Sequence, residues 1–300
     1  MSEEMSEGKK ITLLGATEIR QIAEQLGVVP SKSLGQNFVH DSNICEKIVR
    51  LAGITAKDRV VEIGPGLGSL SLSIARTGAH LIAVELDHRL AKRLPQTLRE
   101  HGVSDRAFTV IVKDAMELTA EELAGSDPGE RSIKVVANLP YNVSVPVLIH
   151  LLEMERIESA MVMVQSEVAR RLAAKPGSKE YGVPSAKVAW YADATLSDSI
   201  PRAVFWPVPR VDSSLLQLRV HRPIAGNEDR RLTFEIIDAA FNQRRKMLRG
   251  SLSRLLTERA PDRGVEEILE RAGIDPTARA ESISVEGFLS IARAIRASEH

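Results

Sequence analysis

The chain has 300 residues, and its 40 Lys and Arg balance its 40 Asp and Glu, so net charge alone does not announce a nucleic-acid partner. This length suits one large domain or two ordinary ones. The single cysteine, Cys45, excludes an intramolecular disulfide, and no apolar run approaches the roughly 18–20 residues of a membrane span.

The N-terminal region is polar at first and then helical. Residues 1–10 have mixed charge, unlike a signal peptide, so we expect them to be disordered and the protein to be cytoplasmic. Apolar residues recur at helical spacing between Ile19 and Leu26, which predicts a short helix that ends at Gly27.

A polar segment with a glycine covers residues 32–41. It has two interpretations: an unstructured arm, or a lid over a ligand in which Gln36 and Asn37 supply polar contacts. A helix capped by Asp41 or Ser42 is expected to follow.

The strongest local signal lies between Val60 and Leu70, where an apolar strand enters a turn with Gly64, Gly66 and Gly68. A helix follows and ends at Gly78. Glycine lets the backbone approach a ligand closely and adopt dihedral angles that other residues avoid. The strand–turn–helix context therefore predicts a nucleoside-containing cofactor.

Two further strands end in acidic residues. The strand His80 to Val84 runs into Glu85, which suits hydrogen bonds to ribose hydroxyls, although a surface carboxylate is the alternative. The strand Thr109 to Val112 is followed by Asp114, which could accept from an adenine amino group. The G-x-G-x-G spacing favours S-adenosylmethionine over a dinucleotide.

The segment Asn138-Leu139-Pro140-Tyr141 lies between an apolar strand, Ile133 to Ala137, and an apolar helix that we expect Ser144 to cap. Open α/β sheets bind ligands at such strand ends. The Asn138 amide oxygen and a main-chain carbonyl can accept two hydrogen bonds from one exocyclic amine, and the ring of Tyr141 can stack on a base. A plain strand-to-helix turn is the alternative interpretation.

The second half begins with strands and ends with helices. Phe205 lies in a stiff loop with two prolines and a Trp, where it could close on the second face of a base held by Tyr141 or simply pack in the core. A linker at residues 223–227 precedes a helical C-terminal region. The elements expected before the linker are a strand Met161 to Val164, a helix Gln165 to Ala174, a basic loop at residues 175–179, and strands near Ala186 to Asp193 and Leu215 to Val220.

A basic cluster without acidic residues occupies the stretch from Phe241 to Arg254. Such a cluster is usually a solvated face, and RNA phosphate binding is the other interpretation. Its members are Arg244, Arg245, Lys246, Arg249 and Arg254.

With these motifs assembled, the chain resembles the ribosomal RNA adenine dimethyltransferases, specifically the bacterial small-subunit (KsgA-type) enzymes. The resemblance runs from about Ser31 to Ile295. It rests on nine stretches in the family's order: SLGQNFVHD (33–41), VVEIGPGLGSL (60–70), VELD (84–87), KDAM (113–116), ANLPYNVS (137–144), QSEVARRL (165–172), GSKEYG (177–182), FWPVPRVDSS (205–214) and AFNQRRKMLR (240–249).

The resemblance implies a fold and a set of site residues. The fold is the α/β, Rossmann-like fold of class I S-adenosylmethionine-dependent methyltransferases, with a mostly parallel seven-stranded sheet that has one antiparallel edge hairpin, and a small C-terminal all-α domain. Val39 departs from the family's usual leucine, which should be silent if its contact is through the main chain. The implied cofactor-binding residues are Asn37, Val39, Gly64, Glu85, Asp114 and Asn138.

It also implies three domains and three groups of functional residues. We expect an N-terminal extension at 1–30, a methyltransferase domain at 31–222 and a helical RNA-binding domain at 223–300. The catalytic candidates are Asn138, Pro140, Tyr141 and Phe205, and the RNA-binding candidates are Arg244, Arg245, Lys246 and Arg249. No metal-ligand cluster is evident in the sequence, and no metal is expected.

The expected activity is N6,N6-dimethylation of two adjacent adenosines in a hairpin loop near the 3′ end of 16S rRNA, with a role in ribosome biogenesis. The partner is then the small ribosomal subunit, without a membrane, and the protein is expected to be a monomer. The alternatives are a large-subunit rRNA adenine N6-methyltransferase of the resistance type and a non-catalytic RNA-binding assembly factor. A nicotinamide oxidoreductase is disfavoured by the glycine spacing.

Overall fold

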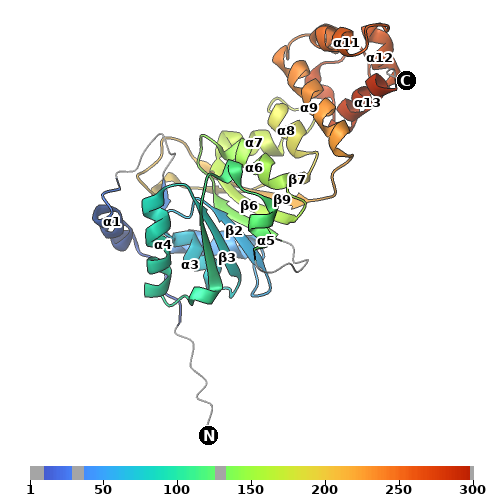
Figure 1. The fold of residues 1–300 in the computed structure, drawn as a ribbon. Coiled ribbons are helices and arrows are strands. Elements are labelled where there is room, and N and C mark those ends of the chain that lie inside the picture. Colours follow the sequence, from blue (N-terminus) through green and yellow to red (C-terminus); the bar gives the residue numbers. More distant parts are fainter. Residues whose placement is uncertain (1–9, 29–36, 126–132, 298–300) are drawn as a thin grey trace. The chain divides into compact units, whose positions relative to one another are not determined.

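A seven-stranded sheet forms the centre of the computed structural model, which describes residues 10–28, 37–125 and 133–297 (Figure 1). The strand order is β4-β3-β2-β5-β6-β9-β7. β2 pairs in parallel with β3 and β5, β3 with β4, and β5 with β6, which confirms the predicted mostly parallel α/β sheet. The strands are β2 Arg59–Ile63, β3 His80–Glu85, β4 Phe108–Val112, β5 Ile133–Asn138, β6 Ile157–Gln165, β7 Ala192–Ile200 and β9 Ser213–Val220.

The chain reverses its direction across the sheet at β2. It runs outward from β2 to β3 and β4 and then returns to β5, on the other side of β2. Ile63 lies beside Val84, and Val84 beside Ile111, so the carboxyl ends of β2, β3 and β4 are level. Ligands of open α/β sheets bind at this kind of switch point.

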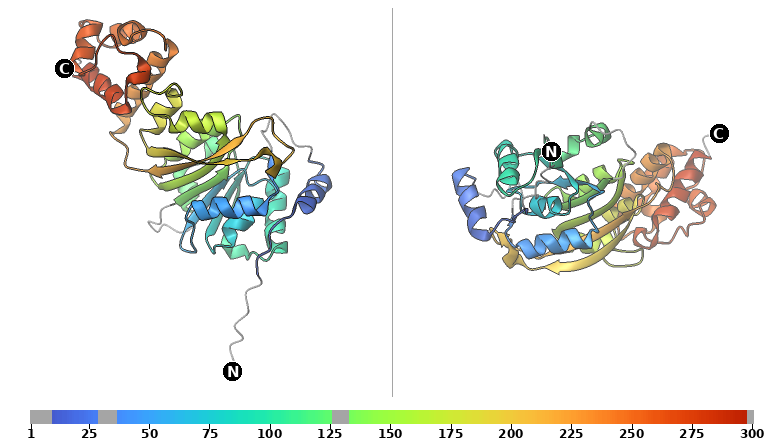
Figure 2. Two further views of the ribbon diagram at one scale, coloured as in Figure 1. Left: turned by 180° about the vertical axis from the view of Figure 1, so that it is seen from behind. Right: turned by 90° about the horizontal axis from the view of Figure 1, so that it is seen from below.

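Helices cover both faces of the sheet (Figure 2), and α2, α3 and α4 share one face, where they pack in a single hydrophobic cluster with Val60 and Leu81 of the sheet. The helices of this part of the chain are α1 Ala16–Gln25, α2 Ser42–Leu51, α3 Ser69–Ala75, α4 His88–Glu100, α5 Ala120–Ala124, α6 Ser144–Leu152 and α7 Ser166–Ala173, with 3₁₀ turns η1 Asp105–Ala107, η2 Ala115–Glu117 and η3 Arg202–Val204.

A two-stranded sheet pairs two short strands that are far apart in the sequence. β1 Phe38–Val39 runs antiparallel to β8 Phe205–Trp206. The rings of Phe38 and Trp206 are stacked, with centroids 6.2 Å apart and planes at 23°.

The helix ends show which local signals were reliable. Asp41 caps α2 as predicted, accepting hydrogen bonds from Asn43 N (2.9 Å) and Ile44 N (3.4 Å). Gly27, at a φ of 58°, follows the end of α1. The prediction for Ser144 was wrong, because α6 begins at Ser144 itself and the Ser144 hydroxyl donates to the Tyr141 carbonyl at 3.5 Å.

The predicted strand from Ala186 to Asp193 was also wrong. Residues Val183–Val188 form the helix α8, and β7 begins only at Ala192. Pro184 fits the first turn of a helix, where its missing N–H is not needed, and Ser185 Oγ accepts from Gly182 N at 3.1 Å. These start signals outweigh the alternating apolar pattern.

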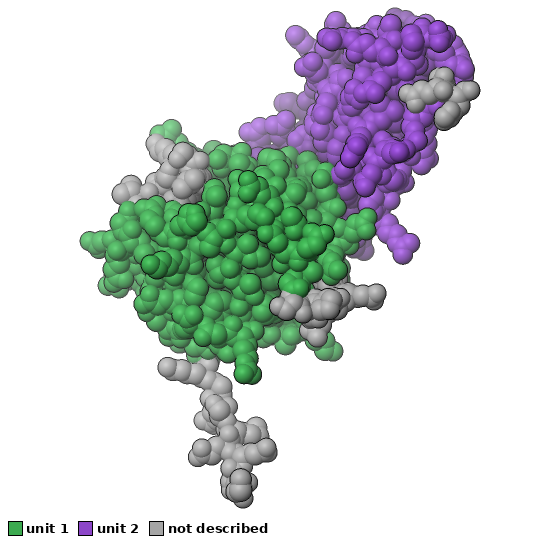
Figure 3. Space-filling view, viewed as in Figure 1, with its two compact units in different colours: residues 1–166, 196–218 green, residues 167–195, 219–300 purple. Residues whose placement is uncertain are grey.

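The chain divides into two compact units (Figure 3): residues 1–166 with 196–218, and residues 167–195 with 219–300. The second unit has its own hydrophobic core, which includes Ile237, Leu252 and Phe288. Trp190 is fully buried in this unit and meets Phe234 edge to face at 5.8 Å. Its remaining helices are α9 Asn227–Asn242, α10 Leu248–Ser251, α11 Ser253–Arg259, α12 Val265–Arg271 and α13 Val285–Arg296, with η4 Ala280–Ser282.

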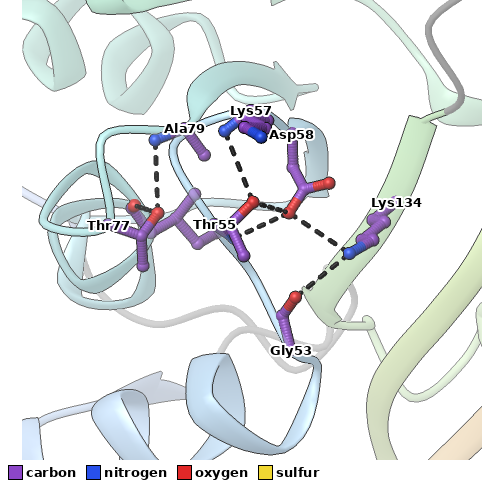
Figure 4. A network of polar contacts seen from close by, with 8 residues as sticks. Gly53, Thr55, Lys57, Asp58, Thr77, Ala79 and Lys134 are labelled. Atoms are coloured by element: carbon purple, nitrogen blue, oxygen red, sulfur yellow. Dashed lines mark hydrogen bonds and ion pairs between the residues drawn. The ribbon is translucent and has the colours of Figure 1, made fainter.

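The starting ends of β2 and β5 are joined by a polar network around Asp58 (Figure 4). Asp58 Oδ2 accepts from Thr55 N (2.6 Å), Thr55 Oγ1 (3.0 Å) and Lys134 Nζ (3.2 Å), and Lys134 also donates to the Gly53 carbonyl at 3.0 Å. Burial raises the pKa of Asp58, but the hydrogen bonds and the Lys134 ammonium outweigh it and hold the pKa below its ordinary value. This network ties together the amino-terminal ends of β2 and β5, at the opposite end of the strands from Glu85 and Asn138.

Glu62 on β2 is a carboxyl group inside the core. Its side chain is 1% exposed, and Oε2 accepts a hydrogen bond from Ser71 Oγ of α3 at 2.6 Å. Burial, with a contribution from the charge of Glu85, raises the pKa of Glu62 to about 8. The carboxyl group therefore stays largely protonated at neutral pH.

We expect Glu62→Gln to remove a pH dependence of stability. The folded pKa of about 8 exceeds the ordinary value of 4.5, so between these values the folded chain holds a proton that the unfolded chain releases. The free energy of unfolding should then fall as pH rises through this window, by at most about 1.4 kcal/mol per pH unit. In urea unfolding at pH 5, 6, 7 and 8, the free energy of unfolding of the variant should rise relative to that of the wild type as pH rises. A constant difference between the two proteins would contradict this.

Among the residues that the structure describes, no helix is long and apolar enough to cross a membrane.

Candidate active site

The glycine turn begins where β2 ends. Gly64, Gly66 and Gly68 all have positive φ, at 67°, 57° and 102°. At Gly66 the lack of a side chain is required twice, because an added Cβ would also lie 2.9 Å from the ring of Phe38. The backbone of the turn therefore packs closely against the Phe38 ring, and Gly64 and Gly66 also line the cavity beside the turn.

Glu85, the last residue of β3, is only 7% exposed and contacts this turn. Its Oε2 accepts from Gly66 N at 3.1 Å and its Oε1 from Asp87 N at 3.0 Å. Burial raises the pKa of Glu85, and the two backbone hydrogen bonds oppose that rise. A carboxylate with two remaining acceptor sites thus lies beside the glycine turn, which suits a pair of ribose hydroxyls.

Asp114 follows β4 and is exposed. Its Oδ1 accepts from Met116 N at 2.9 Å, which starts η2 and leaves the second carboxylate oxygen for a ligand. The flanking Ala115 and the exposed Leu86 offer apolar surface beside it.

Asn138, the last residue of β5, has a side-chain amide whose orientation is set by one hydrogen bond. Its Nδ2 donates to the main-chain carbonyl of Asn37 at 3.0 Å. Its Oδ1 is buried and has no hydrogen-bond partner among the described residues. A buried amide oxygen without a partner costs free energy, so this atom is an acceptor prepared for a donor.

Pro140 and Tyr141 follow directly. The Pro140 carbonyl accepts from Val143 N at 3.2 Å, which leaves one lone pair for a second donor. The Tyr141 hydroxyl shares a hydrogen bond of 2.7 Å with Ser213 Oγ, and burial raises the pKa of Tyr141. This bond fixes the edge of the ring.

One cavity joins most of the predicted residues. Its lining includes all six predicted cofactor residues and Pro140: Asn37, Val39, Gly64, Glu85, Asp114, Asn138 and Pro140. Phe38, Leu90 and Val147 also line it and were not predicted, because apolar residues in a strand or helix give no sign of facing a ligand rather than the core. Gln36, the other predicted lid residue, lies outside the described residues.

Phe205 and Tyr141 are not in this lining. Phe205 is 1% exposed and belongs to the hydrophobic cluster of the first unit, with its backbone paired to Val39. A contact of its ring with a base would need β8 to rearrange.

The predicted RNA-binding residues differ in how they are engaged. Arg244 donates to Glu281 Oε2 (3.0 Å) and to the Lys179 carbonyl (2.6 Å), and Arg249 pairs with Glu266 at 2.9 Å. Arg245 and Lys246 are exposed and form no ion pair with any residue of the described ranges. Within the described part of the chain, they are the cations of this cluster without an ion pair.

Across residues 10–28, 37–125 and 133–297, no group of three or more His, Cys, Asp or Glu side chains is placed to hold a metal ion.

Comparison with known proteins adds a family to this geometry. The sequence model of the family described as ribosomal RNA adenine dimethylase matches residues 30–297. The protein named ribosomal RNA small subunit methyltransferase A from Corynebacterium jeikeium (strain K411) is 48% identical, covering 95% of this chain and 96% of its own. The protein of the same name from Cutibacterium acnes is 46% identical, covering 94% of each chain.

Two solved structures have a similar fold. The dimethyladenosine transferase from Plasmodium falciparum has a TM-score of 0.71 at 21% identity, covering 85% of this chain and 95% of its own. The 23S rRNA methyltransferase ErmE has a TM-score of 0.60 at 24% identity, covering 87% and 100%.

Proposed function

The chain belongs to the ribosomal RNA adenine dimethylase family, and we propose that it transfers methyl groups from S-adenosylmethionine to adenine N6 atoms of small-subunit ribosomal RNA. Its fold is the Rossmann-like α/β fold of class I S-adenosylmethionine-dependent methyltransferases. It is an enzyme of the small-subunit rRNA adenine dimethyltransferase type.

The cavity has the groups that S-adenosylmethionine requires. Gly64 and Gly66 bring the backbone of the glycine turn to the wall of the cavity, while the Phe38 ring fills the space where a side chain on Gly66 would be. We assign Glu85 to the ribose hydroxyls and Asp114 to the adenine amino group, with Gly64, Asn37 and Val39 around the remainder. When bound, this cofactor supplies a methyl group on a positively charged sulfur.

The observation that carries the proposal is the buried Oδ1 of Asn138, which has no partner among the described residues and belongs to a residue that lines the same cavity. The lone pair of an adenine amino group is delocalised into the ring, so the nitrogen is a poor nucleophile. Hydrogen bonds from its two N–H groups to Asn138 Oδ1 and the Pro140 carbonyl favour a pyramidal nitrogen whose lone pair faces the methyl group. The chain thus contributes mainly positioning, which can supply up to roughly 7–11 kcal/mol in ideal cases.

Base stacking completes the proposed site. The ring of Tyr141, held by Ser213, offers one face, and a stacked base contributes on the order of 1–3 kcal/mol. This is comparable to the cost of extruding a base, which is least in a single-stranded loop. After one transfer the amine has lost a donor, so the second transfer proceeds with one hydrogen bond fewer.

We propose two adjacent adenosines in a hairpin loop near the 3′ end of 16S rRNA as the substrate, in the cytoplasm and with a role in ribosome biogenesis. The large-subunit alternative is not favoured, because relatives named for the small subunit are 46–48% identical and ErmE only 24%. The orientation of the Asn138 amide, which leaves its buried Oδ1 without a described partner, argues against a purely non-catalytic assembly factor.

The test is incubation of the purified protein with unmodified small subunits and S-adenosylmethionine labelled at its methyl group. We expect label in two neighbouring adenosines, each with two methyl groups, mapped by nuclease digestion and mass spectrometry. Large subunits serve as the control. Label confined to large subunits, or no label in either, would refute the proposal.

We propose residues 223–300 as the RNA-binding domain, within a monomeric protein whose methyltransferase domain spans 31–222 after an extension at 1–30. The proposed RNA contacts are Arg244, Arg245, Lys246 and Arg249, and among them Arg245 and Lys246 are exposed without a described ion-pair partner. Arg244 is engaged by Glu281 and the Lys179 carbonyl, so its replacement would also disturb the second unit itself.

We therefore expect Arg245→Gln with Lys246→Gln to weaken RNA binding through lost phosphate contacts. The slope of log K against log salt should decrease by about 1.4–1.8, the value for two phosphate contacts. Filter binding between 50 and 300 mM KCl measures the slope. Arg271→Gln is the control, because Arg271 is exposed in the same unit but lies outside the basic cluster and pairs with Glu267. An unchanged slope would show that Arg245 and Lys246 make no phosphate contacts.

A further inference from the structure

We propose that the β1–β8 strand pair is a positioning device for the catalytic amide, in which Phe38 and Trp206 act through the Asn37 carbonyl on Asn138. This inference rests on the proposed function and adds to it the contacts that fix the orientation of the Asn138 amide.

An asparagine side chain has little intrinsic preference between the two orientations of its amide group. Rotation by 180° about its last torsion exchanges the oxygen and the nitrogen at similar intrinsic energy. A main-chain carbonyl can only accept, so the Asn37 carbonyl requires the NH₂ group of Asn138 on its side. Oδ1 must then point the other way, where it is buried without a partner among the residues described. The reversed amide would present N–H groups to an adenine amine and repel it.

The Asn37 carbonyl is in turn held by the strand that follows it. β1 pairs with β8 through Phe38 opposite Trp206 and Val39 opposite Phe205. Beyond β1, His40 N donates to the Val204 carbonyl at 2.9 Å. This pairing fixes the backbone directly after Asn37. It also accounts for the burial of Phe205, which anchors β8 in the core.

Two ring contacts set the position of β1 relative to the glycine turn. The Phe38 ring stacks on Trp206 at 6.2 Å, and its Cδ1 and Cε1 atoms lie 2.9 Å from the point where a Cβ on Gly66 would be. Phe38 therefore has no room to move into the turn. Trp206 is not among the residues that line the cavity, so it can affect the reaction only through its neighbours.

The test compares Trp206→Leu with Trp206→Phe. We expect Trp206→Leu to lower kcat, measured at saturating cofactor, about tenfold, the scale of one weakened hydrogen bond in the transition state. The Kd for S-adenosylmethionine should rise by a smaller factor, because Glu85 and Asp114 do not depend on the strand pair. Trp206→Phe keeps an aromatic ring for stacking and should restore most of kcat. Val208→Ala is the matched control, since Val208 lies in the same loop and is 64% exposed.

A double-variant cycle separates positioning from general structural damage. If Trp206 acts through Asn138, then Trp206→Leu should have no further effect on the residual rate of Asn138→Ala. Equal losses of kcat in both backgrounds, or a normal kcat for Trp206→Leu, would overturn the inference. A wild-type protein that failed to methylate adenine in small subunits would instead refute the proposed function.

Discussion

Replacement of Asn138 by alanine is expected to lower kcat by about 10²–10³-fold, the range for the loss of one hydrogen-bonding group aimed at a transition state. The variant loses the buried Oδ1, which has no hydrogen-bond partner among the described residues and is the proposed acceptor for the adenine amino group. It also removes the hydrogen bond from Asn138 Nδ2 to the Asn37 carbonyl, and water can enter the space left by the amide. The rate of methyl transfer to unmodified small subunits, under saturating cofactor, measures the effect.

Cofactor binding should be retained in Asn138→Ala, with a weakened Kd at most, because the groups assigned to the ribose and adenine lie on β3 and after β4. Isothermal titration with S-adenosylmethionine provides this control. Asn138→Asp adds a second check, since a carboxylate cannot donate to the Asn37 carbonyl and should also be slow. Near-normal turnover of either variant would remove Asn138 from its catalytic role.

Glu85→Gln is expected to weaken the binding of S-adenosylmethionine by about 10–100-fold, because hydrogen bonds to a charged group are worth about 1.5–3 kcal/mol. The carboxylate has two acceptor oxygens, one facing Gly66 N and one facing Asp87 N. Glutamine has one acceptor oxygen, so its NH₂ group must meet one of these N–H groups. The variant loses both the ribose contact and part of the support of the glycine turn.

The measurement is the cofactor Kd by calorimetry, with kcat at saturating cofactor as the second readout. We expect the KM for S-adenosylmethionine to rise much more than kcat falls. Glu117→Gln is a matched control, because Glu117 is exposed on η2 and does not line the cavity. A Kd for Glu85→Gln equal to that of Glu117→Gln would contradict the assignment of Glu85.

Much of the fold and of the cavity could be predicted because its signals are local. Gly64, Glu85, Asp114 and Asn138 each lie at or just after the end of a strand that the apolar pattern predicts. Parallel strands bring their carboxyl ends to the same edge of a sheet, so the convergence of these residues follows from the strands alone. The structure places all of them in one cavity.

The rest depended on contacts between distant parts of the chain. The bond from Asn138 to the Asn37 carbonyl spans 101 residues and ends on the main chain, which leaves no mark in the sequence. The ion pair of Arg244 with Glu281 could not be seen from a basic cluster alone. The same holds for Phe205, because an aromatic residue in a proline-rich loop suits a base or a core equally well, and only the pairing with β1 shows its surroundings.

The placement of the two tryptophans gives the protein a built-in optical probe for each compact unit. Trp206 belongs to the first unit, beside Phe38, and Trp190 is buried in the second. In Trp206→Phe, tryptophan fluorescence therefore comes from the second unit alone, and the difference from the wild-type tryptophan emission isolates the first. Melting curves recorded this way would follow the unfolding of the two units separately in one cuvette, without any added dye.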